Sequence, residues 1–346
     1  MITISTSKNS RFKRRPLSVS RVSSTELTKE YFHNPDSQFI LVVEALATQM
    51  CLKDWIAANQ KRLQKALSVH GGVLFRNFNL PTPEAFSEAV TAVSTHRLDY
   101  LERAAPRNEV IDKVFTSTEF ASEQLIPLHH EMSYSHNWPE KIYFYCDVAP
   151  IHQGRTPLAD ERRVTQKISP EIKERFLANG VMYVRNYSPD IDFSWQDAFQ
   201  TDNPLDVEEY CRKNQMTWTW LDRDRLRTQQ VRQAMVEHPK TGELLWFNHA
   251  HLFHISNMKP SLANMLIQSF GEEGLPRNAY YGDGQPIELK VLEQIREAYI
   301  SEITAFKWQR HDFLMLDNFN TVHGREPFSG SRRILVAMTD LFEHQA

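Results

Sequence analysis

Residues 313–338 read FLMLDNFNTVHGREPFSGSRRILVAM and contain the clearest strand signals of the chain. Its two apolar runs, FLMLD (313–317) and RRILVAM (332–338), have the aliphatic and β-branched composition of strands, and a polar, glycine-containing segment separates them. His323 lies at a strand end in that segment, and Arg333 opens the next strand ten residues later. The stretch therefore predicts a C-terminal hairpin that holds an imidazole and a guanidinium close together.

A second group of polar side chains lies far upstream, in LHHEMSY (128–134). Residues i and i+2 of a strand project from one face, so His129 and Glu131 are expected to point together while His130 points away. Two histidines and one carboxylate on one face of an octahedral ion leave three positions open, as in non-haem Fe(II) oxygenases. Arg333 would then offer a planar fork to a dicarboxylate. The plainer alternatives are a polar strand end at 129–131 and a surface ion pair at Arg333.

The composition excludes several classes of protein. The chain has 346 residues, 41% of them hydrophobic, and a formal net charge of −3. It is long enough for a substantial core, and its charge argues against nucleic acid as the main ligand. Cys51, Cys146 and Cys211 are far apart and form no CxxC pair, so we expect no disulfide framework and a reducing, cytoplasmic compartment. No apolar run approaches the roughly 20 residues of a membrane span, so no membrane partner is expected.

Strand patterns dominate both ends of the second half of the chain, and helix patterns lie between and outside them. Helices are expected at 53–69, from 83 onward, from 170 to Gly180, at 261–270 and at 288–301; strands are expected at 73–78, 142–148, 181–187, 313–317 and 332–338, with a hairpin at 225–247. The predicted class is mixed α/β, mainly β: a β-sandwich or jelly roll with flanking helices.

Several long motifs resemble one known family and occur in the same order. They are HGGVLFRNF (70–78), YLERAAPR (100–107), LHHEMSY (128–134), QGRTPLAD (153–160), WFNHAHLFH (246–254) and the C-terminal stretch. The chain resembles the TauD/TfdA group of Fe(II)- and 2-oxoglutarate-dependent dioxygenases, most closely its branch of syringomycin-type aspartyl hydroxylases. The resemblance implies a double-stranded β-helix (clavaminate synthase-like) core within a single domain, residues 1–346. Residues 1–35 would form a basic N-terminal arm or strand, and about 190–305 an insert between the jelly-roll halves.

Carried over position by position, the resemblance assigns the site. His129, Glu131 and His323 would bind Fe(2+), with O2 as a further co-substrate and no catalytic residue beyond the metal ligands. Arg333 and Thr156 would bind the distal carboxylate of 2-oxoglutarate. Ala337 stands where taurine dioxygenase has a sulfonate-binding arginine, which argues against a taurine-like sulfonate.

The resemblance also implies a reaction: hydroxylation of an unactivated C–H bond in an amino-acid-like substrate, in a specialised-metabolite pathway. The substrate would be free or tethered to a peptidyl carrier protein. Arg103 and Arg107 are candidates to bind its carboxylate, and pairing with neighbouring glutamates is the alternative. Desaturation or cyclisation would use the same cofactor chemistry.

A rival group of residues is His249, His251 and His254. Three histidines suit catalytic zinc, so a zinc hydrolase is the alternative from another class of enzyme, and a binding module without catalysis is a second. The plainer interpretation of these residues is an aromatic-rich pocket wall, because Trp246, Phe247, Leu252 and Phe253 flank them. The sequence leaves the oligomeric state open.

Overall fold

The structure is a computed structural model that describes residues 27–99, 107–117, 120–189 and 193–344. Its largest sheet has eight strands in the order β1-β2-β3-β17-β7-β20-β5-β4, of which only β2 and β3 run parallel. The strands of this sheet are β1 (Thr28–Asn34), β2 (Phe39–Ala45), β3 (Gly72–Arg76), β4 (Glu109–Ile111), β5 (Val114–Thr116), β7 (Asn137–Val148), β17 (Phe313–Asp317) and β20 (Arg333–Glu343).

A four-stranded sheet lies opposite, in the order β16-β9-β18-β6, and β8 and β19 form a short separate pair. These strands are β6 (Ile126–His129), β8 (His152–Gln153), β9 (Thr156–Asp160), β16 (Thr304–Phe306), β18 (Thr321–Arg325) and β19 (Phe328–Ser329). Between β17 and β20 the chain crosses to this sheet as β18 and returns. The predicted C-terminal hairpin is therefore wrong: β7 separates β17 from β20, because consecutive strands of a jelly roll alternate between its two sheets.

Side-chain alternation along β20 shows how the large sheet divides two cores. Ile334, Val336 and Met338 belong to the cluster between the two sheets, together with side chains of β9 and β16. Leu335 and Ala337 belong to the outer cluster, against three helices. The inward face of β20 is therefore the face that can contribute to a site between the sheets.

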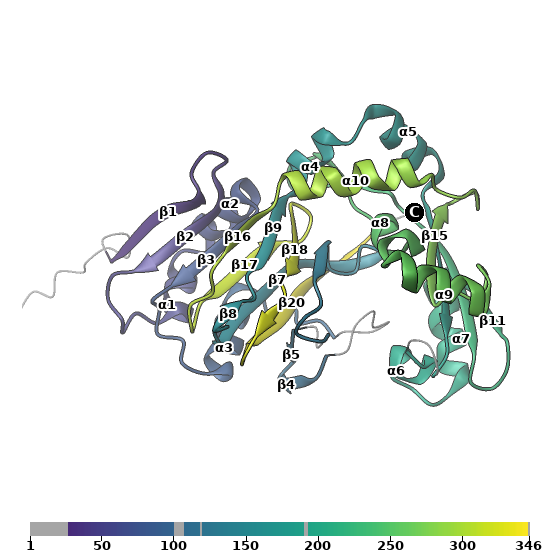
Figure 1. Ribbon diagram of the computed structural model, residues 1–346. Coiled ribbons are helices and arrows are strands. Elements are labelled where there is room, and N and C mark those ends of the chain that lie inside the picture. Colours follow the sequence, from purple (N-terminus) through teal and green to yellow (C-terminus); the bar gives the residue numbers. More distant parts are fainter. Residues whose placement is uncertain (1–26, 100–106, 118–119, 190–192, 345–346) are drawn as a thin grey trace, which may run out of the picture.

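Helices cover both outer faces of this sandwich (Figure 1). They are α1 (Leu52–Ala58), α2 (Gln60–His70), α3 (Pro83–Val93), α4 (Glu161–Lys167), α5 (Pro170–Asn179), α6 (Trp195–Phe199), α7 (Pro204–Lys213), α8 (Ala250–Phe253), α9 (Pro260–Phe270) and α10 (Leu289–Ser301). The first three pack on the large sheet. Helices α4, α5, α8 and α10 share a third cluster with the small sheet. None of the helices in the described ranges is long and apolar enough to cross a membrane.

The segment between β9 and β16 forms a further four-stranded sheet outside the jelly roll, which we call the second sheet. Its strand order is β11-β12-β10-β15. Between β12 and β15 the chain also forms a separate hairpin, β13–β14. The strands are β10 (Val181–Tyr187), β11 (Thr217–Trp220), β12 (Leu226–Arg232), β13 (Met235–Glu237), β14 (Leu244–Trp246) and β15 (Arg277–Tyr281). Figure 1 shows β11 and β15, with α6, α7 and α9, on the opposite side of the molecule from β1–β3. This sheet begins at β10, before the insert boundary expected near residue 190.

Most of the expected helices and strands are present, and capping residues and prolines explain where the expected helices begin. The Thr82 side chain caps α3, with Pro83 at its start, and Ser169 caps α5 in the same way. The helix expected at 53–69 is instead two helices that meet at Asn59. The hairpin expected at 225–247 is reduced to β13–β14, because β12 pairs with β10 and β11. Of the basic arm expected at 1–35, the described part forms edge strand β1, and residues 1–26 lie outside the described ranges.

Candidate active site

Strands β6 and β18 bring together two histidines from distant parts of the chain. His129 is the direct cross-strand partner of His323, and their ring centroids lie 4.4 Å apart. Together with Glu131 they offer three ligand atoms that all lie within 4.8 Å of one another. Among the residues that the structure describes, this is the one group of three His, Cys, Asp or Glu side chains arranged to hold a metal ion. Two imidazoles and a carboxylate are the donors of the non-haem iron facial triad.

Glu131 reaches this position by a different route from the one expected. Strand β6 ends at His129, so Glu131 lies in the turn that follows rather than on the same strand face. The buried side-chain amide of Asn318 fixes the turn: Oδ1 accepts from the Glu131 N–H at 2.8 Å, and Nδ2 donates to the Glu131 carbonyl at 3.0 Å. His130 points away from the group, and its Nδ1 donates to the Asn318 carbonyl at 2.6 Å. The segment that leads into His323 therefore also holds the backbone of Glu131.

Both histidines of the group are held as neutral imidazoles. Nδ1 of His129 lies 2.8 Å from the Pro127 carbonyl; a carbonyl only accepts, so Nδ1 carries the proton and Nε2 keeps its lone pair. Burial lowers the pKa of His129, although the charge of Glu131 opposes the shift. Burial, with His129 nearby, places the pKa of His323 well below its usual range. Neutral imidazoles can bind a metal at neutral pH without first losing a proton.

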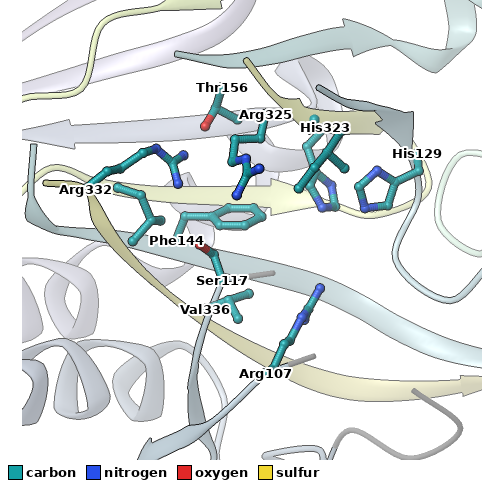
Figure 2. Close-up of a pocket in the computed structure, with 12 residues that line it drawn as sticks. Arg107, Ser117, His129, Phe144, Thr156, His323, Arg325, Arg332 and Val336 are labelled. Atoms are coloured by element: carbon teal, nitrogen blue, oxygen red, sulfur yellow. The ribbon is translucent and has the colours of Figure 1, made fainter. Parts of the chain in front are cut away.

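A cavity extends from His129 and His323 between the two sheets of the jelly roll (Figure 2). Arg332, Arg325 and Thr156 line it together with Phe144 and other side chains. The Arg332 Nε donates to the Gly154 carbonyl at 3.2 Å. Burial, with Arg325 nearby, lowers the pKa of Arg332 to about 10, so it stays charged at neutral pH. The Thr156 hydroxyl, also buried, accepts from the Trp308 indole N–H at 2.9 Å.

Arg333 does not line this cavity, in contrast to the position that the sequence predicted for it. Its side chain is 45% exposed and donates to Asp147 at 2.9 Å. The pairing of β20 with β7 shifts register between Arg333 and Ile334. Counting residues from His323 therefore does not show which of the two arginines faces the cavity. Arg332, its neighbour, lines the cavity instead. Val336 stands four residues beyond Arg332 and also lines it, so a sulfonate-binding arginine is still absent from that position.

The two arginines proposed for substrate have different outcomes. Arg103 lies outside the described residues. Arg107 is buried, and its Nη2 lies 2.8 Å from Oε2 of Glu131. The sequence offered neighbouring glutamates as partners of Arg107, but its ion pair is with the carboxylate of the metal-binding group. Arg107 lines both the cavity described above and a second one.

The rival histidines do not converge on a common point. His249 Nε2 bonds the His130 carbonyl at 3.0 Å, whereas His254 Nδ1 bonds the Ser256 hydroxyl at 2.8 Å. The His251 ring stacks on Tyr299, and burial lowers the pKa of His251 to about 3. With separate partners, His249, His251 and His254 do not form a zinc site.

The second cavity has a volume of about 210 Å³ and opens on the other side of His129 and Glu131. Its walls come from β6 and the turn after it, from α8, and from Arg277 of β15. It therefore lies between the jelly roll and the second sheet, and His249 is one of its wall residues.

The comparisons with known proteins define the class. Residues 43–339 match the taurine catabolism dioxygenase TauD, TfdA family. Dapdiamide synthesis protein DdaC of Enterobacter agglomerans is 39% identical over 278 residues, which cover 80% of this chain and 84% of that protein. A clavaminate synthase-like protein of Arabidopsis thaliana is 29% identical over 297 residues, covering 82% and 86%.

Solved structures show the same fold at lower identity. PvcB of Pseudomonas aeruginosa has a TM-score of 0.52 at 17% identity, covering 92% of this chain and 94% of that one. PvcB is described as an Fe, alpha-ketoglutarate dependent oxygenase from an isonitrile synthetic pathway. AAD-2, solved with Mn(II) and N-oxalylglycine, has a TM-score of 0.51 at 13% identity, covering 90% and 96%.

This chain belongs to the TauD/TfdA family. It is an Fe(II)- and 2-oxoglutarate-dependent dioxygenase with a jelly-roll core, as the sequence resemblance implied.

Proposed function

We propose that this dioxygenase binds Fe(II) through His129, Glu131 and His323, binds 2-oxoglutarate against Arg332 and Thr156, and hydroxylates an unactivated C–H bond of an amino-acid-like substrate. The observation that carries the proposal is the convergence of the three ligand atoms within 4.8 Å, beside a cavity that Arg332 and the buried Thr156 line. When bound, iron and 2-oxoglutarate supply an oxidant made from O2 that can break such a bond, and 2-oxoglutarate leaves as succinate and CO2.

The residues present fit both groups. Neutral imidazoles with one carboxylate suit Fe(II), and burial keeps both histidines neutral. A charged guanidinium beside a buried hydroxyl suits a carboxylate, because guanidinium binds that group through a planar fork and burial strengthens the attraction. The part of these side chains in the reaction is to bind and orient the co-substrate and to exclude water.

The substrate assignment rests on the cavity and on the relatives. A volume of about 210 Å³ next to His129 and Glu131 suits a molecule the size of an amino acid. DdaC and PvcB are named for biosynthetic pathways, which supports a role in specialised metabolism. A peptidyl carrier that delivers the substrate remains part of the proposal, and so do desaturation and cyclisation as other outcomes. The free thiols of Cys51, Cys146 and Cys211 support a cytoplasmic location.

The test is an anaerobic titration of the purified protein with Fe(II) and 2-oxoglutarate. Wild type should develop the visible charge-transfer band of the iron–2-oxoglutarate chelate, and His323→Ala should not. His254→Ala is the matched control, because this histidine bonds Ser256 rather than the triad, and it should keep the band. A wild-type protein without the band would overturn the proposal.

A further inference from the structure

Arg277, the first residue of β15, lies on the wall that the second sheet contributes to the 210 Å³ cavity. Its guanidinium carbon lies 5.6 Å from the ring centroid of Phe253, another wall residue. A planar cation against an aromatic face has a defined position. The cavity therefore has the metal-binding group, with His129 and Glu131, in one part of its wall and an oriented guanidinium in another.

Aromatic rings connect these two parts of the cavity wall. Phe253 packs edge-on against His249 at 5.6 Å and against Tyr134 at 5.5 Å, and His249 in turn lies 6.0 Å from His129. Surroundings of this kind have a low dielectric constant, so an ionic contact made inside them is stronger than one made in water. Apolar walls with a few placed polar groups are typical of sites that orient a small ligand.

The second sheet concentrates positive charge on this side of the cavity. Arg185 of β10 is the direct cross-strand neighbour of Arg277, so both project from one face, and Arg185 is only 3% exposed. A second guanidinium next to Arg277 adds to the positive potential at that residue and so favours an anionic ligand there. Arg107 also lines this cavity, where it pairs with Glu131 at 2.8 Å.

We infer that Arg277 binds a carboxylate of the substrate and so orients it toward the metal-binding group. This inference rests on the proposed function and narrows its substrate class. The guanidinium would take the carboxylate through two parallel N–H···O bonds. A thioester to a carrier protein removes the charge of the carboxyl that forms it, so the carboxylate that Arg277 binds is a free one in a substrate of amino-acid size.

The test uses the full chain with Fe(II) and 2-oxoglutarate in the absence of O2. The probes are the twenty L-amino acids, each as the free acid and as its carboxamide, and binding is measured by isothermal titration calorimetry. At least one acid should bind wild type, with its amide roughly 10-fold weaker or worse. Arg277→Gln should weaken the acid by roughly 10- to 100-fold and leave the amide unchanged, and Arg277→Lys should fall between the two.

Arg227→Gln is the matched control. Arg227 belongs to the same sheet but is the cross-strand partner of Asn186, so it projects from the other face. It pairs with Glu273 at 3.5 Å. Arg227→Gln should therefore leave the affinity for the acid unchanged. Failure of every acid to bind, equal binding of acids and amides, or an unchanged Arg277→Gln would each overturn the inference. The charge-transfer band in the same samples separates the two proposals: absent from wild type, it contradicts the proposed function, whereas present without acid preference it contradicts only the role of Arg277. Its presence in Arg277→Gln also shows that the variant is folded.

Discussion

At the scale of single residues, two adjacent arginines have opposite environments. Arg332 is partly buried and lines the cavity with Thr156, whereas Arg333 is paired with Asp147 at the surface. Successive residues that enter a strand face opposite sides, so only one of the two can reach a ligand between the sheets. An exposed ion pair contributes little to stability, whereas a buried guanidinium next to a carboxylate would decide the affinity for 2-oxoglutarate.

Replacing each arginine in turn tests this assignment. Arg332→Gln should raise the dissociation constant of 2-oxoglutarate by roughly 10- to 100-fold, because a hydrogen-bonded ion pair in a buried site is lost. Arg333→Gln should change it less than about 3-fold. Both constants are measured from the charge-transfer band during anaerobic titration with 2-oxoglutarate. The reverse order of effects would restore Arg333 as the co-substrate residue.

Asn318 acts through Glu131, since its amide makes hydrogen bonds to both backbone groups of that ligand. We therefore expect Asn318→Ala to weaken Fe(II) binding by roughly 10- to 100-fold, as loss of a supporting partner commonly does. Asn318→Asp keeps the acceptor and loses the donor, so it should show an intermediate affinity and a shifted band. If both variants lose thermal stability equally while Fe(II) affinity and the band position stay unchanged, the role of Asn318 is purely structural.

How much of the site the sequence predicts depends on the kind of information required. His129, Glu131 and His323 are found from their types, their spacing and their family motifs, and the structure brings them together. The choice between Arg332 and Arg333 needs the register shift in β20. Arg277 has no signal in the sequence, because its place in the cavity depends on how the second sheet packs against the jelly roll.

At the scale of elements, the pairing of β6 with β18 is what joins the metal-binding group. The two strands carry His129 and His323 at one register position. Gly324 follows His323, and a Cβ atom there would lie 2.5 Å from the Ile126 carbonyl oxygen of β6. Only glycine allows the two backbones to approach this closely.

Gly324→Ala should therefore separate the strands. We expect the free energy of unfolding to fall by about 1–3 kcal/mol, as for other overpacked sites, and Fe(II) affinity to fall with it. Chemical denaturation and anaerobic Fe(II) titration measure the two effects. Gly271→Ala is the control: its φ of 68° strains the backbone, but no atom lies within 4 Å of the added Cβ, so it should lose stability without losing iron. Unchanged iron affinity in Gly324→Ala would contradict the role given to this strand pair.

Elements with strong local signals are predicted well from sequence, and those defined by distant partners are not. Capping residues and proline mark the starts of α3 and α5, and β10 matches its predicted bounds. The error at 225–247 arose because β12 pairs with β10 and β11 rather than with the strand after its own turn. Separation of β17 and β20 by β7 likewise depends on a partner from the middle of the chain.

At the scale of the whole molecule, the proposed sites assign cofactor binding to the jelly roll and part of substrate binding to the second sheet. The space between the two jelly-roll sheets holds the cavity with Arg332 and Thr156. The space toward the second sheet holds the proposed substrate cavity, with walls from both parts. A shared cluster, which includes Leu128 of β6, packs the second sheet against the jelly roll. Substrate preference should therefore change with the second sheet, while cofactor binding should not.

Because the three proposed ligands come from β6, the turn after it and β18, metal and 2-oxoglutarate should stabilise the entire fold. Ligand at about 100 times its dissociation constant adds about 2.7 kcal/mol, and for a chain of this size we expect Tm to rise by roughly 3–5 °C. Differential scanning fluorimetry under argon measures the shift, which EDTA should reverse. His129→Ala should show no shift; a shift of full size in that variant would place the metal elsewhere.

The most direct measurement is a crystal structure of the protein with Mn(II) in place of Fe(II) and with 2-oxoglutarate, recorded with anomalous scattering. We predict one metal peak, about 2 Å from an imidazole nitrogen of His129 and of His323 and from a carboxylate oxygen of Glu131, with no fourth protein ligand. The distal carboxylate of 2-oxoglutarate should lie on Arg332. A peak among His249, His251 and His254, or a fourth side chain on the metal, would contradict the account.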